Sequence, residues 1–221
     1  MPRSRNQAIT ETAPAEPVQP DSLDISISIG DMTPKAMRGL IRILYARQKL
    51  LAAMIRNSDI HIDGELIDLL DDEKPDTLER ISELVQNEVR VDMVKGIQLT
   101  SDSLGIAVPG AEHTQEEIVI YARLLDRILE RARSAGNVSR KLIDPPEDEM
   151  KYYCYSFLNQ LGMAGPEHST HRHLLTGHLK GYAAFKSKAQ LDAHIARITA
   201  RRRAERETIH APADLEAGDG E

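Results

Sequence analysis

Apolar residues recur along most of the chain at the three-to-four spacing of amphipathic helices. The first long run predicts a helix from Pro34 to about Asn57, capped by Thr33, because proline at the first helical position loses no hydrogen bond. A second long helix is predicted from Thr114 to Ala135, with an apolar stripe along one side. Helices therefore dominate the predicted fold.

Short strand signals interrupt these helices. Residues 24–30 alternate apolar and polar side chains, which is typical of a strand with one buried face. Residues 96–100 and 104–108 predict a β-hairpin joined by a three-residue turn. A short extended piece is expected at 60–62. The pattern thus predicts a small antiparallel sheet beside the two long helices.

Capping residues indicate where further helices begin. Asp76 is expected to cap a helix in which Glu79, three residues on, bonds back to the cap amide. Thr114 and Glu117 have the same spacing and predict a second capping box. A short helix is also expected over residues 65–70.

The C-terminal third reads as three helices, at about 146–161, 166–179 and 187–207. Gly162 and Gly165 separate the first two, a spacing compatible with a helix-turn-helix unit whose second helix reads DNA. That helix is poor in Arg, Gln and Asn, the usual base-reading residues, which weighs against this interpretation.

The predicted fold class is α+β and mostly α-helical. Two long helices pack with a small antiparallel sheet in an α+β domain over residues 23–140. A C-terminal basic, helix-turn-helix-like helical domain is expected at 146–207. Residues 1–22 are expected to form a disordered tail and residues 208–221 an acidic disordered tail.

Composition limits the class of protein. Hydrophobic residues make up 41% of the chain and charged residues 29%, which supports a folded core. No apolar run approaches a membrane span and no secretory signal is visible, so we expect a cytoplasmic protein without a membrane partner. The single cysteine, Cys154, is expected to be inert core. Phosphate-binding and nucleophile motifs are missing, so no enzymatic activity, catalytic residue or cofactor is predicted.

Charge is divided unevenly along the chain. The total is −7, yet the stretch from Lys151 to Glu207 carries ten basic and four acidic residues. That stretch is therefore +6 and the remainder −13. A basic segment on an acidic protein indicates an anionic partner, most commonly nucleic acid. The alternative is that the two halves neutralise each other within the fold.

The first long helix carries a basic stripe on the side opposite its apolar face. Four cations fall within about 40° of one another, with Tyr45 between them and Lys35 alongside. The four are Arg38, Arg42, Lys49 and Arg56. The stripe predicts contacts with phosphates or with an acidic partner, and the alternative is an ordinary solvated helix face. Arg47 lies on the apolar side, where it must either extend its charged end to solvent or find a partner, and one of the many acids is expected to be that partner rather than a catalytic role being expected.

Further cations in the C-terminal third complete the predicted nucleic-acid-binding set, including a basic arm near the end of the last helix. The predicted residues are Arg172, Lys180, Lys186, Lys188, Arg201, Arg202 and Arg203. The alternative for the arm is favourable placement of cations at a helix C-terminus.

Aromatic and histidine residues gather in the same third of the chain. Six of the eight aromatic residues lie between Tyr152 and Phe185, where core packing is preferred over base stacking. His168, His171 and His178 share one side of the predicted helix. No familiar metal-ligand spacing accompanies them, so no metal is predicted.

Several stretches carry a resemblance to a known group of proteins. They are residues 37–51, 149–152, 158–167, 172–175 and 179–186. These stretches resemble a group of uncharacterised proteins carried on conjugative and other mobile elements of gut bacteria. The likeness covers roughly residues 34–188. The group has no established activity, so the resemblance implies only a bacterial mobile-element context, in which DNA-handling accessories and inhibitors of host defence are encoded.

Taken together, the sequence predicts a non-enzymatic nucleic-acid-binding accessory protein of a bacterial mobile element. The alternative is a protein-interaction module, such as an inhibitor of a host defence nuclease or regulator. Both hypotheses require that cations from distant parts of the chain meet on one open surface.

Overall fold

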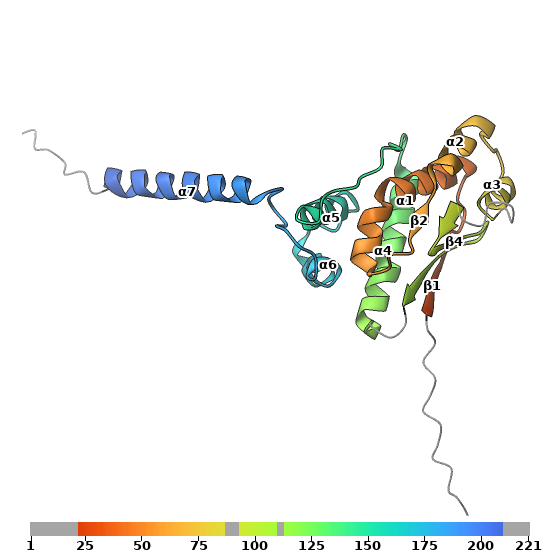
Figure 1. The fold of residues 1–221 in the computed structure, drawn as a ribbon, viewed down its shortest axis with the longest axis horizontal. Coiled ribbons are helices and arrows are strands. Elements are labelled where there is room, and N and C mark those ends of the chain that lie inside the picture. The colour runs from red at the N-terminus through yellow and green to blue at the C-terminus, as the bar shows by residue number, and fades with distance from the viewer. Residues whose placement is uncertain (1–21, 87–92, 110–112, 210–221) are drawn as a thin grey trace, which may run out of the picture.

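A computed structural model describes residues 22–86, 93–109 and 113–209. The chain is mostly α-helical with a small antiparallel sheet, which confirms the predicted α+β class (Figure 1). The predicted tails lie outside the described residues, except for Ser22 and for 208–209.

The sheet has three strands in the order β1-β5-β4, all antiparallel. Strand β1 spans Ser22–Ser28, β4 spans Ile97–Leu99 and β5 spans Ser103–Pro109. Ile106 of the central strand is paired with Ile25 on one side and Ile97 on the other. This register places apolar side chains of all three strands on one face, so the predicted strand and hairpin are confirmed.

A second, two-stranded ladder pairs β2 (His61–Ile62) with β3 (Val94–Lys95). The extended piece at 60–62 was predicted, whereas β3 was not. Gln48 fixes this ladder to the first long helix, because its amide donates to the carbonyl of Ile62 and accepts from the Ile62 N–H, at 3.1 and 2.7 Å.

The two long helices begin at their predicted caps. Helix α1 spans Pro34–Ile55, and the Thr33 hydroxyl accepts the Ala36 N–H at 3.2 Å. Helix α4 spans Gln115–Ser134 and has the complete capping box of Thr114 and Glu117.

Two shorter helices lie between them. Helix α2 spans Gly64–Glu73 and is capped by Asp63. Helix α3 spans Leu78–Val85, and the predicted cap Asp76 is wrong. The backbone is still extended at Thr77, whose hydroxyl accepts the Arg80 N–H at 3.2 Å, so the helix begins one residue later than predicted.

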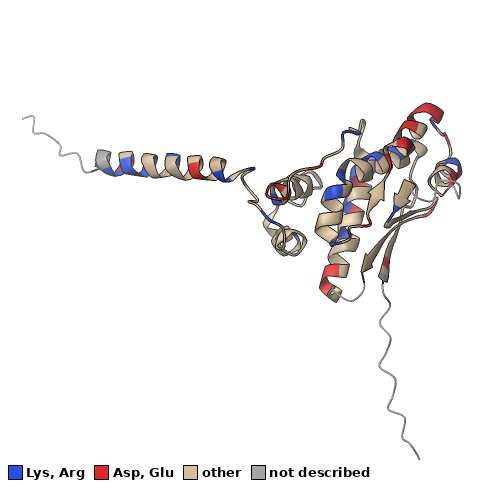
Figure 2. Ribbon diagram, viewed as in Figure 1, with Lys and Arg blue, Asp and Glu red and all other residues tan. Residues whose placement is uncertain are grey.

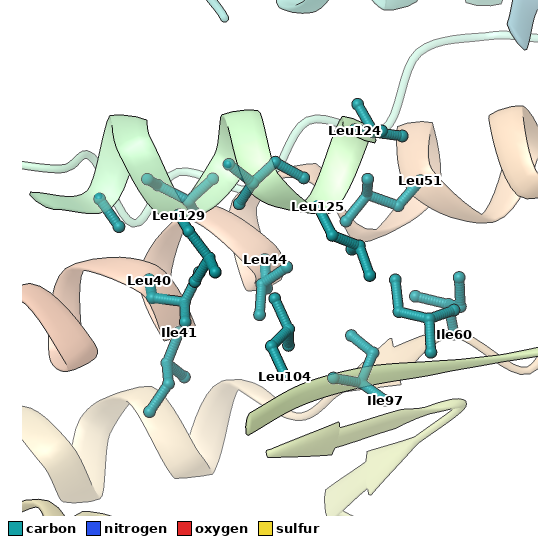
Figure 3. Close-up of a cluster of buried hydrophobic side chains, with 14 of the residues drawn as sticks. Leu40, Ile41, Leu44, Leu51, Ile60, Ile97, Leu104, Leu124, Leu125 and Leu129 are labelled. Carbon is teal, nitrogen blue, oxygen red and sulfur yellow. The ribbon is translucent and has the colours of Figure 1, made fainter. Parts of the chain in front are cut away.

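The core lies between α1, α4 and the sheet (Figure 3). Leu44 of α1, Leu125 of α4 and Leu104 of β5 are almost fully buried there. Helix α1 is central: α2, α3, α4, α5, α6 and the β2 strand all pack on it. Most of its surface is therefore covered by protein.

The chain then continues into α5 (Met150–Gln160), a 3₁₀ turn (Pro166–His168) and α6 (Ser169–Thr176). Cys154, Phe157 and Leu175 from this region belong to the same core cluster as the side chains of α1 and α4. The connecting segment also joins the core region, because the Ile143 N–H donates to the Ala46 carbonyl at 2.9 Å. The hydrophobic core thus runs across the predicted boundary between residues 140 and 146.

Helix α7, Lys188–Ile209, projects away from this body as a long arm (Figure 1). From residue 188 to residue 206 every side chain is exposed except that of Leu191, which is half-buried. At a rise of about 1.5 Å per residue, an arm of this size is about 33 Å long.

Candidate nucleic-acid interface

The basic stripe of α1 is largely occupied by contacts within the protein. Arg42 forms an ion pair with Asp71 of α2, and Arg38 donates to the carbonyl of Pro75. Arg56 pairs with Glu117 of α4 at 2.5 Å. These three members of the stripe thus have partners in α2, in the segment after α2 and in α4, while the Arg42 and Arg56 side chains are still 29% and 32% exposed.

Arg56 belongs to a polar cluster that joins the end of α1 to the start of α4. Its guanidinium lies 2.9 Å from Nδ1 of His113, which also lies 3.0 Å from the Tyr121 hydroxyl. Burial raises the pKa of Glu117, but two hydrogen bonds from Thr114 and the charge of Arg56 outweigh it, so this pKa lies below its ordinary value. The cluster therefore holds two helices together, which accounts for Arg56 structurally.

The other two residues of the stripe differ from each other. Lys49 is exposed and forms no ion pair with the described residues. Tyr45 is half-buried, and its hydroxyl lies over Gly64 at the start of α2, where a Cβ would approach it to 3.2 Å. Tyr45 thus packs between helices, while Lys49 remains available.

One part of the stripe does face a hollow in the surface. A cavity of about 310 Å³ is lined by Arg38 and Arg42 together with Lys35 and Lys74, and Asp71 is the one acid in its lining. Neither lysine forms an ion pair within the described part of the chain. This hollow keeps a local positive charge, although its two arginines are already engaged.

Two lysines of the C-terminal third are neutralised by nearby acids. Lys180 pairs with Glu147 at 2.7 Å and Lys186 with Glu149 at 3.4 Å. Lys186 also lies over the ring of Tyr153, and hydrogen bonding to Tyr153 and Glu149 raises its pKa. Both acids lie between the end of α4 and the first residue of α5. Each of these predicted lysines therefore has an acidic neighbour within the protein, although the Lys180 side chain is still 68% exposed.

Arg172 stabilises the turn between α5 and α6. Its guanidinium donates to the carbonyls of Met163 and Gly165, at 2.5 and 2.7 Å. The predicted helix from 166 to 179 is a 3₁₀ turn followed by the eight-residue α6, in which Leu175 and Thr176 are buried. A helix-turn-helix arrangement is present, but its second helix is short and packs against α1, α4 and α5.

The histidines do not form a metal centre among the described residues, where no group of three or more potential ligands occurs. His168 and His171 are adjacent, with their Nδ1 atoms 3.2 Å apart. His178 lies elsewhere, with Nε2 2.8 Å from the carbonyl of Ala53. The Cys154 thiol is buried, which confirms the expectation of a core residue, and burial raises its pKa to about 12.

The aromatic residues are divided between core and surface. Phe157 is buried in the main core, and Tyr153 packs against it. Tyr182 is 37% exposed. The ring centre of Phe185, which precedes α7, lies 4.9 Å from the ring centre of His194, which lies within α7. The preference for core packing therefore holds for Phe157 and Tyr153 only.

Helix α7 carries basic positions along much of its length (Figure 2), and from residue 188 to residue 206 its side chains are exposed except for the half-buried Leu191. Between Lys188 and Arg206 it carries six basic and two acidic side chains. Arg201 pairs with Glu205 at 2.8 Å, with its side chain still 81% exposed. Arg203 also has an interaction partner. The other four cations of α7 form no ion pair with the described residues. These remaining cations are Lys188, Arg197, Arg202 and Arg206.

The predicted site residues are thus separated into two groups. Those on the body are mostly paired or packed, and those on α7 are mostly open to solvent. Arg197 and Arg206 belong to the open group although the predicted set omitted them; their sequence signal is their place in the basic arm.

No protein-family model, curated protein or solved structure matches this chain. Among the described helices, none combines the length and the apolar composition that crossing a bilayer requires.

Proposed function

We propose that the protein is a non-enzymatic nucleic-acid-binding protein that acts through α7. The observation that supports this most is a 22-residue helix that leaves the body and exposes side chains on every side, with six cations against two acids between residues 188 and 206. Four of these cations, Lys188, Arg197, Arg202 and Arg206, are exposed and form no ion pair with the described residues, and phosphates are common ligands of such cations.

The distribution of the arginines favours a groove over a flat surface. At about 100° per residue, Arg197 and Arg206 lie on opposite sides of α7, and Arg202 and Arg203 diverge by about 100°. A helix in a major groove has phosphates on both sides, so cations around its whole circumference find partners there. The body would then anchor the arm without contacting bases.

Fluorescence anisotropy with a labelled duplex of about 20 base pairs tests this function. If about four phosphate contacts form, affinity should fall by about a hundredfold between 50 and 200 mM salt, because bound cations release counterions. The variant Arg201→Gln/Arg202→Gln/Arg203→Gln should bind more weakly at low salt and show a shallower salt dependence.

The matched control removes the same charge from the body. The variant Arg80→Gln/Arg127→Gln/Arg140→Gln deletes three arginines that already pair with acids. It should bind as the unmodified protein does. Absence of binding at 50 mM salt, or equal losses in both triple variants, would contradict the proposal.

A second candidate function, a protein-interaction module such as an inhibitor of a host defence nuclease or regulator, is favoured by one observation. Leu191, Ile195 and Ile198 follow one another at spacings of four and three on α7, and the two isoleucines are 51% and 37% exposed. Such a stripe fits an apolar groove on a partner. Ile195→Ser/Ile198→Ser should abolish capture of a single protein from nuclease-treated lysate while leaving duplex binding intact. The mobile-element context is supported by the sequence resemblance alone.

A further inference from the structure

A second cationic site lies on the body, in a cleft between α1, α4, α5 and the segment that follows α4. Its volume is about 240 Å³, and it is centred on Arg47 of α1 and Arg131 of α4. Apolar walls come from Ile43, Phe157 and Leu161, and no acidic residue lines it. The cleft is separate from α7 and from the predicted stripe.

Arg47 is the unusual residue of this cleft. It lies on the covered side of α1 and is half-buried, yet no carboxylate of the described residues pairs with it, against the sequence expectation of an acidic partner. Its one hydrogen bond is a long contact of 3.4 Å to the carbonyl of the adjacent Ala46. The loss of hydration lowers the pKa of its guanidinium. A cation that is partly removed from water is stabilised by an anionic partner, and no carboxylate of the described residues provides one for Arg47.

Phe157 supplies part of the missing interaction. The guanidinium carbon of Arg47 lies 5.8 Å from the centre of the Phe157 ring, which is itself 4% exposed. A cation over an aromatic face is stabilised, but the ring does not offer the hydrogen-bond acceptors that a carboxylate or phosphate offers to guanidinium N–H groups. Phe157 therefore stabilises the charge of Arg47 without taking the place of an anionic partner.

Arg131 makes the opposite wall cationic as well. It is exposed in the last turn of α4, and its side chain forms no ion pair with described residues. Interaction with the helix dipole accounts for a cation at this position. The helix dipole does not account for Arg47, the second cation that lines the same cleft. The two guanidinium groups repel each other, and a bound anion would offset that repulsion.

We propose that this cleft binds a small organic oxyanion, with a carboxylate or phosphate head held by Arg47 and Arg131 and an apolar body against Phe157 and Leu161. Charge complementarity selects the head, because both cations lack acidic partners. Asn137, Ser139 and Gln160 line the same space and provide neutral hydrogen-bonding groups. The apolar wall selects against a bare inorganic ion, and the volume admits a ligand of small-molecule size.

Isothermal titration calorimetry of the full chain with phenyl phosphate and with phenylacetate tests the proposal and distinguishes the two head groups. Saturable binding of either compound is expected, with phenylacetamide, the neutral analogue, binding at least tenfold more weakly. Inorganic phosphate alone should also bind at least tenfold more weakly than phenyl phosphate. If neither anion shows saturable binding at concentrations up to about 100 μM, which is about 100 times a micromolar Kd, the assignment is overturned.

Variants locate the site. Arg47→Met keeps an unbranched apolar stem beside Phe157 but removes the guanidinium, and it should reduce affinity at least tenfold, and Arg131→Gln should reduce it several-fold. Arg127→Gln, on the same helix but outside the cleft, should bind as the unmodified protein does. If Arg47→Met does not fold, as judged by circular dichroism, Arg131→Gln carries the test because that side chain is exposed. Unchanged affinity in the folded variants would overturn the proposal.

This inference is independent of the function proposed for α7. Arg47→Met should leave salt-dependent duplex binding unchanged, and the α7 triple variant should leave phenyl phosphate binding unchanged. Displacement of phenyl phosphate by an equimolar duplex would instead assign the cleft to nucleic-acid phosphates and overturn the small-molecule assignment.

Discussion

Helices α1 and α7 have the same length, 22 residues, and both are rich in arginine, yet they occupy opposite environments. Helix α1 is at the centre of the body, and half its residues are buried. Helix α7 is exposed along its described side chains. The difference shows that the cations of a helix stay exposed only where the rest of the chain leaves that helix uncovered.

The cations of the two helices differ in the same way. Arg42 and Arg56 of α1 lie near acids that α2 and α4 bring to them. The ion pair of Arg201 with Glu205 on α7 is instead local, because it joins residues four apart on the same helix. Neutralisation therefore depends on tertiary packing, which the spacing of arginines along one helix does not reveal.

The largest expected effect is the loss of stability on truncating a core side chain, which should be large in α1 and small in α7. Leu44→Ala in α1 removes a side chain that is 1% exposed and should lower the free energy of unfolding by about 2–5 kcal/mol. Ile198→Ala in α7 should change it by less than about 0.5 kcal/mol, because no core packs there. Urea denaturation followed by circular dichroism compares them; equal losses would show that α7 is docked on the body.

The next comparison concerns helix propensity. Ala196→Gly/Ala200→Gly should weaken α7 by about 2 kcal/mol in total, because each glycine costs about 1 kcal/mol in a helix interior. An exposed helix of this length is marginally stable, so helical circular dichroism should fall while the urea midpoint of the body stays constant. A lower midpoint would contradict the independence of the arm. Ala46→Gly in α1 is the control, and it should lower that midpoint.

A smaller effect is expected from freeing a paired cation. Asp71→Asn removes the acid that contacts both Arg42 and Arg140 and should lower the free energy of unfolding by about 0.5–1 kcal/mol, since these groups are partly exposed. The substitution also leaves Arg42 and Arg140 without this acidic partner. If an arginine without an acidic partner is enough to bind phosphates, the variant should bind the duplex more tightly than the unmodified protein does. Asp72→Asn, on an exposed neighbour, should change neither quantity. A stability loss equal to that of Leu44→Ala would contradict a partly solvated pair.

The smallest effect is a pH dependence confined to the body. Burial, Arg123 and His168 lower the pKa of His171 from its ordinary 6.5. The unfolded chain therefore binds more protons below about pH 6.5, so the contribution of His171 to stability is complete above that pH and is lost as the pH falls through the lowered pKa. Urea midpoints near pH 8 and pH 5.5 should differ less in His171→Gln than in the unmodified protein. An unchanged difference would contradict a role for His171, and His61→Gln is the exposed control.

Much of the fold was predictable from local pattern. Thr33, Asp63 and the pair Thr114–Glu117 cap their helices because the relevant bonds join residues two or three apart. The cap at Thr77 was missed, since Asp76 is an equally good capping residue and only the backbone conformation decides between neighbours. Strand β3, two residues long, carries no pattern of its own and exists because β2 pairs with it.

The candidate sites were less predictable. The basic arm of α7 was visible in the sequence as a run of arginines, and the structure keeps it exposed. The cleft around Arg47 was not visible as a site. Arg131 and Phe157 lie more than 80 residues along the chain from Arg47, so no spacing relates them. Only the packing of α4 and α5 on α1 brings these three side chains to one cavity.

The sequence by itself determined the helices, the hairpin, the mostly helical α+β class and the excess of cations near the C-terminus. These depend on hydrogen bonds and apolar periodicity over a few residues, which local order encodes. Tertiary structure alone decided which arginines meet a carboxylate, which meet an aromatic ring and which meet water. Charge pairing acts through space over a few ångströms, and residues that distant in the chain become neighbours only when the core forms.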